Sequence, residues 1–153
     1  TEDAVYVAFG NADIARYSHD GELVWGKRYL PTFGDPKMAW GYGLSPVVLD
    51  DAVLFPWDHH TGPCFLIGLD KQTGEEHCQK RLSGDCNSTP LASDGRIYVS
   101  NNEGTTFVVR AGENFELLST NELGERITAS PAISGNDLIY RTDSHLYCIG
   151  QAH

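Results

Sequence analysis

The sequence predicts an all-β protein made of β-propeller blades, and two observations carry this prediction. The first is a repeat: Ser45-Pro46, Thr89-Pro90 and Ser130-Pro131 recur at intervals of 44 and 41 residues, and a short apolar run follows each pair. The second is strand chemistry, since runs rich in Val, Ile, Leu, Tyr and Phe alternate with Gly, Asp and Asn and show no 3.6-residue period. We therefore expect four short antiparallel strands per repeat and little helix.

Each repeat is predicted to follow the same order of strands and turns. The first strand follows the proline, where a missing N–H costs least, and ends at a tight turn. These turns are Asp50-Asp51, Asp94-Gly95 and Gly135-Asn136. The predicted second strands are 52–56, 96–100 and 137–141, the third strands are 64–69, 106–110 and 145–149, and the fourth strands are 76–81 and 116–120. The opening residues fit the same frame without its first strand, with strands at 4–9, 14–18 and 22–29.

The repeat divides the chain into a partial blade at 1–43, two full blades at 44–86 and 87–128, and a partial blade at 129–153. This arrangement has 14 strands, or about 3.5 blades, whereas a propeller of roughly seven or eight blades is about twice as long. We therefore expect the C-terminal portion of a larger propeller, in the form of an open arc. Its exposed end blades should associate with a companion chain that carries the remaining blades, or with a copy of itself.

The turn after the third strand carries a resemblance to a known family. The stretches "ARYSHDGELVW" (15–25), "GLDKQTGEEHC" (68–78) and "VRAGENFELLS" (109–119) align without gaps, and Gly21 and Gly74 fit a turn that needs a positive φ. The second stretch resembles the AxDxxTGxxxW docking motif of quinoprotein-type propellers. The stretch "SPAISGNDLIYRTDSHLYCIG" is similar to the closing blade of bacterial PQQ-like β-propeller repeat proteins. The resemblance implies a secreted or periplasmic protein, and Trp25 should be buried against the neighbouring blade.

Composition and cysteine content exclude several classes of protein. The 153 residues are 41% hydrophobic with a net charge of −10, which disfavours nucleic acid and anionic membranes as partners. No apolar run approaches the roughly 20 residues of a membrane span, so we expect no membrane insertion. The four cysteines, Cys64, Cys78, Cys86 and Cys148, form no CxxC pair, which argues against a zinc ribbon. Three disulfide pairings are open, and buried free thiols are the simpler interpretation.

Strand direction predicts where a ligand or partner would bind. The loops between second and third strands should share one face with the segments that join the blades, and converging loops on a rigid scaffold commonly bind ligands. The candidates on this face are Trp40, Trp57, Asp58, His59, His60, Asn87, Asn101 and Arg126.

Each candidate also has a structural interpretation. His59 and His60, with the preceding aspartate, could hold zinc, copper or nickel, or form a polar turn. Trp40 and Trp57 could stack on a sugar ring, or pack between blades. Arg126 could neutralise an anion, or pair with Glu125 or Asp85.

Signs of catalysis are weak in this sequence. The resemblance implies that a quinone dehydrogenase would carry calcium-holding acids, a catalytic aspartate and often an adjacent cysteine pair, and no Cys-Cys dipeptide occurs. No GxSxG, HExxH or P-loop motif occurs either. The sequence therefore favours a non-catalytic PQQ-like propeller segment that acts as a binding or protein-interaction scaffold, with no cofactor. One alternative is part of an oxidoreductase that uses PQQ with calcium and has its catalytic residues in missing blades. Another is a metal- or glycan-binding module that uses the loop from Trp57 to His60, so the partner could be a protein or a glycan.

Overall fold

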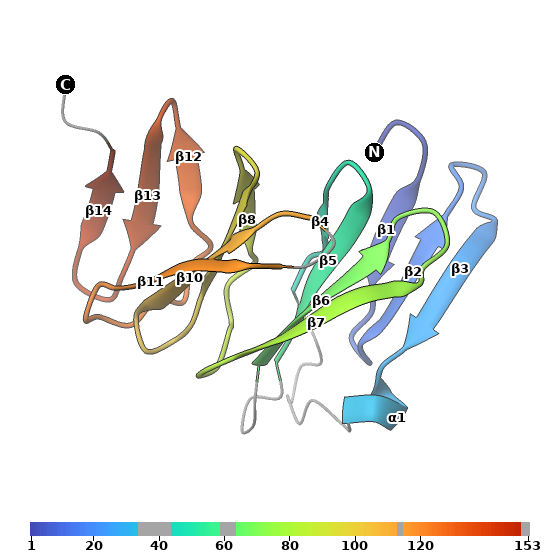
Figure 1. Ribbon diagram of the computed structural model, residues 1–153, viewed down its shortest axis with the longest axis horizontal. Helices are drawn as coiled ribbons and strands as arrows, with labels where there is room; N and C mark the ends of the chain where they lie inside the picture. Colours follow the sequence, from blue (N-terminus) through green and yellow to red (C-terminus); the bar gives the residue numbers. More distant parts are fainter. Residues whose placement is uncertain (34–43, 59–63, 113–114, 151–153) are drawn as a thin grey trace.

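The computed structural model describes residues 1–33, 44–58, 64–112 and 115–150, and these residues form four separate antiparallel sheets (Figure 1). We name the sheets blades A to D. Blade A contains β1 (Val5–Ala8), β2 (Asp13–Tyr17) and β3 (Leu23–Arg28), and the short helix α1 (Leu30–Phe33) follows it. Blade B contains β4 (Val47–Val48), β5 (Ala52–Trp57), β6 (Cys64–Asp70) and β7 (Glu76–Leu82). Blade C contains β8 (Leu91–Ser93), β9 (Arg96–Ser100), β10 (Thr105–Arg110) and β11 (Leu117–Glu122). Blade D contains β12 (Ala132–Ser134), β13 (Asp137–Arg141) and β14 (Leu146–Ile149).

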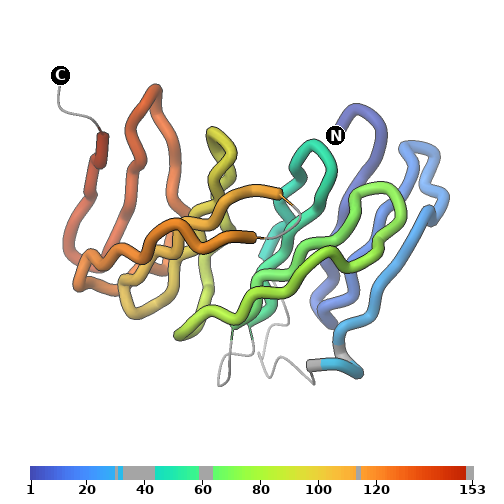
Figure 2. Tube along the Cα trace, in the orientation of Figure 1, coloured from blue at the N-terminus to red at the C-terminus, as the bar shows by residue number. Residues whose placement is uncertain are grey.

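The blades follow one another along an open arc. In Figure 2 the chain passes from blade A, in blue, through blades B and C to blade D, in red at the other end. Within the described residues, blades A and D share no strand pairing. The predicted fold class, an all-β arrangement of propeller blades, is therefore confirmed. No helix among the described residues is long and apolar enough to cross a membrane.

Tight turns have the backbone that their sequences favour. Asp94 and Gly95 both have positive φ, 53° and 68°, which is the type I′ geometry that suits a two-residue hairpin. Gly21 and Gly74 also have positive φ, 84° and 72°, as the motif predicts.

The strand register differs from the ungapped alignment of the three motif copies. Trp25 lies opposite Arg16, whereas Cys78 lies opposite Gly68 and Ser119 lies opposite Val108. The turn between the paired strands therefore grows by one residue from blade to blade. A β-bulge of one residue lies beside each of these pairs, so the bulge is common to the three blades and the difference in length lies in the turn itself.

Blade B is covered on both faces by its neighbours. On the side of blade A, Phe55, Trp57 and Ile67 belong to one apolar cluster with Ile14 and Trp25. On the side of blade C, a second cluster joins the β5 and β6 side chains of the opposite face to β9 and β10. Every residue of β5 is therefore buried, which is why its sequence shows no alternation of polar and apolar positions.

An aromatic ring meets a glycine at each of these two interfaces. Between blades A and B, Trp25 is 9% exposed, its indole Nε1 donates to the carbonyl oxygen of Lys71 at 3.2 Å, and its ring lies against Gly74. This confirms that Trp25 is buried against the neighbouring blade. Between blades B and C, the ring comes from the later blade in the chain and not from the earlier one: Phe115 of blade C packs on Gly68 of blade B. The tryptophan of the motif is replaced in blade B by Cys78, whose sulfur lies beside the same glycine.

Candidate binding face

Asn101 organises the turn between β9 and β10. Its amide oxygen accepts hydrogen bonds from the backbone N–H groups of Glu103 (3.1 Å) and Thr105 (2.8 Å). Its amide nitrogen donates to the carbonyl oxygen of Ser83 at 3.0 Å. The side chain is fully buried, so it ties this turn to the segment that enters blade C rather than presenting a group to a ligand.

The segment that joins blades B and C lies directly against this turn. The backbone N–H of Asn102 donates to the carbonyl oxygen of Asp85 at 2.8 Å. Gly84 has a φ of +72°, and a Cβ there would lie 2.6 Å from the amide nitrogen of Asn101 and 2.8 Å from a Glu103 carboxylate oxygen. A side chain at this position would therefore be strained and would displace the turn.

Glu125 makes the corresponding link between blades C and D. One carboxylate oxygen accepts a hydrogen bond from the Thr142 hydroxyl at 2.6 Å, and the other lies 2.6 Å from Nδ1 of His145. The Thr142 bond and then His145 lower the pKa of this carboxyl group. The backbone N–H of Asp143 donates to the carbonyl oxygen of Arg126 at 3.2 Å. On this face of the arc, the segment that joins two blades therefore contacts a turn of the following blade, both between blades B and C and between blades C and D.

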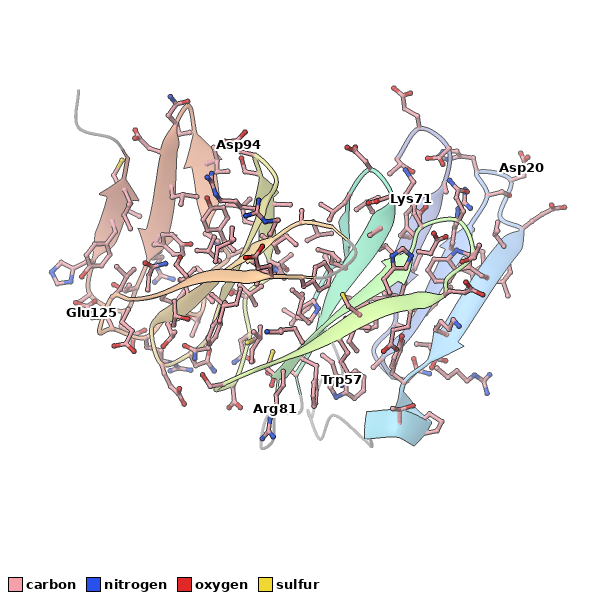
Figure 3. The ribbon with its side chains drawn as sticks, in the orientation of Figure 1. Asp20, Trp57, Lys71, Arg81, Asp94 and Glu125 are labelled. Atoms are coloured by element: carbon pink, nitrogen blue, oxygen red, sulfur yellow. The ribbon has the colours of Figure 1, made fainter. Side chains whose placement is uncertain are left out.

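Two of the predicted candidates lie on segments that are joined on this face of the arc. The N–H of Leu123 donates to the carbonyl oxygen of Gly104 at 3.0 Å, which joins the turn that Asn101 organises to the segment that carries Arg126. Figure 3 shows Trp57, Arg81 and Glu125 toward this face, on the lower side of the view, and Asp20, Lys71 and Asp94 toward the opposite face.

The side chains of the candidates differ in exposure. Trp57 and Asp58 are fully buried, and Trp57 belongs to the apolar cluster between blades A and B, so its side chain packs between blades. Asn87 is half-buried and Arg126 is exposed. Among the described residues, Arg126 makes no ion pair, and the acidic group next to it, Glu125, contacts His145 instead. Trp40, His59 and His60 lie outside the described residues, so a metal or glycan site there stays a prediction.

In the ranges that the structure describes, no three His, Cys, Asp or Glu side chains are grouped so that they could hold a metal ion. We therefore derive no chemical step through a quinone cofactor.

The opposite face of the arc, formed by the hairpin turns, contains a hollow that sequence reasoning did not identify. It has a volume of about 830 Å³ and lies between the hairpin turns of blades B and C, where Asp50, Asp51 and Asp94 are accompanied by Lys71 and Arg96. The turn residues were recognisable in the sequence. Their convergence depends on the angle between two blades, which no local pattern records.

The fold and these inter-blade contacts define a β-propeller repeat protein of the PQQ-like class. Residues 10–115 match the family model described as outer membrane protein assembly factor BamB, PQQ_2. The chain belongs to this family. No curated protein matches the sequence.

Three solved structures share the fold. The computationally designed Ika4 protein has a TM-score of 0.71 at 13% identity, over 98% of this chain and 88% of the designed chain. BamB from Moraxella catarrhalis has a TM-score of 0.52 at 13% identity, over 99% of this chain and 55% of that protein. A protein of unknown function from Bacteroides caccae has a TM-score of 0.63 at 15% identity, over 97% of this chain and 53% of that protein. This chain thus spans about half the length of the last two.

Proposed function

We propose that this chain is a non-catalytic protein-interaction scaffold whose end blades, A and D, pack against further propeller blades of a second copy or a companion chain. The observation that carries the proposal is the distribution of exposed large apolar side chains. Four of the nine such side chains among the described residues lie in blade A, namely Val5, Phe9, Leu23 and Val24, and Leu146 lies on the outward face of blade D. Ile133 and Ile149 both pair with Leu138, so they lie on the face of blade D that is turned toward blade C. The other two, Leu117 and Leu118, lie on β11.

Strand register indicates which face of blade D would receive a partner. Tyr140 pairs with Tyr147 and is buried toward blade C, where it borders a small hollow with Tyr98 and Val108. The next pair, Arg141 with Leu146, must point to the opposite face because successive residues alternate. Leu146 is 73% exposed on that outward face. Blade B packs against a neighbouring blade on both faces, whereas blade A shares an apolar cluster only with blade B within the described residues.

Further support comes from the relatives. This chain spans about half of two propeller proteins, so a partner of similar size would supply the other half of a ring. The family description names an outer membrane protein assembly factor, which favours a protein partner and a secreted or periplasmic location. Apolar surface of this kind is uncommon on a monomer and typically marks an interface.

Light scattering coupled to size-exclusion chromatography tests the proposal. The 16.8 kDa chain should elute at micromolar concentration as a dimer or larger species. Leu146→Asp should shift the mass toward that of the monomer, because a carboxylate would be buried at the interface. Leu118→Asp is the matched control, since Leu118 is 37% exposed on β11 of an inner blade, and it should leave the mass unchanged.

Two results would overturn the proposal. The first is a wild-type chain that remains a monomer and unfolds in one sharp transition. The second is an equal effect of the two substitutions, which would indicate general destabilisation. The oxidoreductase alternative has its own test, since a bound-quinone absorbance after addition of PQQ and Ca²⁺ would favour it over a scaffold.

A further inference from the structure

We infer that Cys64 and Cys86 are a disulfide-forming pair that can covalently join blade B to the segment leading into blade C. The observation is the position of the two thiols in the fold. Both are fully buried in the apolar cluster between blades B and C. Sequence alone leaves three pairings of the four cysteines open, and the fold selects this one.

Strand pairing brings the two cysteines to the same end of blade B. Cys64 is the first residue of β6 and lies opposite Leu82, the last residue of β7. Cys86 follows four residues later, after the chain has turned at Gly84. The β6–β7 hairpin therefore returns the chain to the end of blade B that carries Cys64, and the turn at Gly84 follows before Cys86.

The turn that carries Cys86 is fixed in place. The side chain of Asn101 donates to the carbonyl oxygen of Ser83, and the N–H of Asn102 donates to that of Asp85, so the segment is held on both sides of its glycine. A thiol on such a segment has a defined position, which a disulfide requires because its geometry is narrow.

The two thiols share one buried cluster and interact with each other. Hydrogen bonding to Cys86, followed by burial and by nearby acidic groups that include Asp58 and Asp85, raises the pKa of the Cys64 thiol. A raised pKa leaves little thiolate, and the thiolate is the species that attacks a disulfide. Oxidation of the folded protein should therefore be slow, and the bond should form mainly while the chain folds.

The other two cysteines have different surroundings. Cys78 is half-buried on β7, where its sulfur lies near Gly68 and Phe115. Cys148 is exposed on β14 of the end blade D. They provide internal controls, since they are present in the same molecule and should stay reduced.

The reaction is a thiol–disulfide exchange with a low-molecular-weight disulfide, such as oxidised glutathione. The Cys64 and Cys86 sulfurs lose two protons and two electrons and become bonded to each other. The S–S bond of oxidised glutathione breaks, accepts the two electrons and the two protons, and gives two molecules of glutathione.

The test is refolding of the full chain in a glutathione redox buffer, followed by denaturation, alkylation and tryptic digestion. The four cysteines fall on four different tryptic peptides, which end at Lys71, Lys80, Arg96 and the C-terminus. We expect a linked pair made of the peptides ending at Lys71 and Arg96, with Cys78 and Cys148 alkylated. The bond closes a loop of 23 residues, so oxidation should raise the melting midpoint by roughly 6–12 °C.

Cys78→Ser and Cys148→Ser should keep this shift, whereas Cys64→Ala and Cys86→Ala should remove it. Four alkylated cysteines after refolding in the oxidising buffer, or a link that involves Cys78 or Cys148, would overturn the inference. The peptide result needs no variant, so it decides the question even if an alanine variant fails to fold.

Discussion

Gly74→Ala tests the contact that joins blades A and B. Gly74 has a φ of +72°, which costs a residue with a Cβ about 1–2 kcal/mol. The added Cβ would also lie 2.7 Å and 2.9 Å from Cδ2 and Cε3 of Trp25. That ring is held by its hydrogen bond to Lys71, so it cannot move away freely, and overpacking adds about 1–3 kcal/mol. We expect a total loss of about 2–5 kcal/mol in the free energy of unfolding.

Gly21→Ala is the matched control for backbone strain. Gly21 has a φ of +84° in the equivalent turn of blade A, and a Cβ there would meet nothing within 4 Å. This substitution should cost only the strain, about 1–2 kcal/mol. The difference between the two alanine variants isolates the collision with Trp25.

Combining Gly74→Ala with Trp25→Ala provides a second check. Trp25→Ala alone should cost about 3–5 kcal/mol, because the indole is almost fully buried. In that background there is no ring to collide with, so Gly74→Ala should cost no more than Gly21→Ala costs in the wild type. Urea unfolding followed by far-ultraviolet circular dichroism measures all four variants. If Gly74→Ala and Gly21→Ala cost the same in the wild-type background, the docking argument is wrong.

Three further predictions concern the other contacts between and within blades. Phe115→Ala should cost about 3–5 kcal/mol in urea unfolding, because its ring fills the contact on blade B, whereas the exposed Leu117→Ala should cost under about 0.5 kcal/mol; equal losses would contradict this. Asn101→Ala should cost about 2–4 kcal/mol, because the hydrogen bonds of a buried amide are lost, whereas Asn102→Ala should cost under about 0.5 kcal/mol; a small loss at the first position would refute the capping role. Hydrogen bonds from the following turn, chiefly a backbone N–H, lower the pKa of Asp70, so its contribution is complete above the ordinary pKa and is lost as the pH falls through the lowered value. Asp70→Asn should therefore flatten the loss of stability below about pH 4, and parallel profiles of the two proteins would contradict this.

The predicted binding face shows where sequence reasoning stops. The strand directions that placed Asn101 and Arg126 in neighbouring loops follow from the count of strands, which the repeat provides. Exposure does not follow from that count. Asn101 is a polar residue in a turn, yet its amide is consumed by its own turn and by Ser83. Trp57 ends a strand before a polar loop, yet it is covered by blade A. The hollow beside Lys71 also depends on how two blades meet.

The blades could be predicted from the sequence, because their signals are local. A proline opens each predicted inner strand, a pair such as Asp94-Gly95 selects the hairpin turn, and Gly21 and Gly74 allow the positive φ that the outer turn needs. The contacts between blades could not be predicted in this way, because they arise when the sheets pack together. Phe115 packs on Gly68, and Cys64 and Cys86 belong to one buried cluster. No period or motif in the sequence relates the members of either pair. These contacts are set by the angle and spacing of two sheets, and that geometry arises from the fit of all the side chains between them.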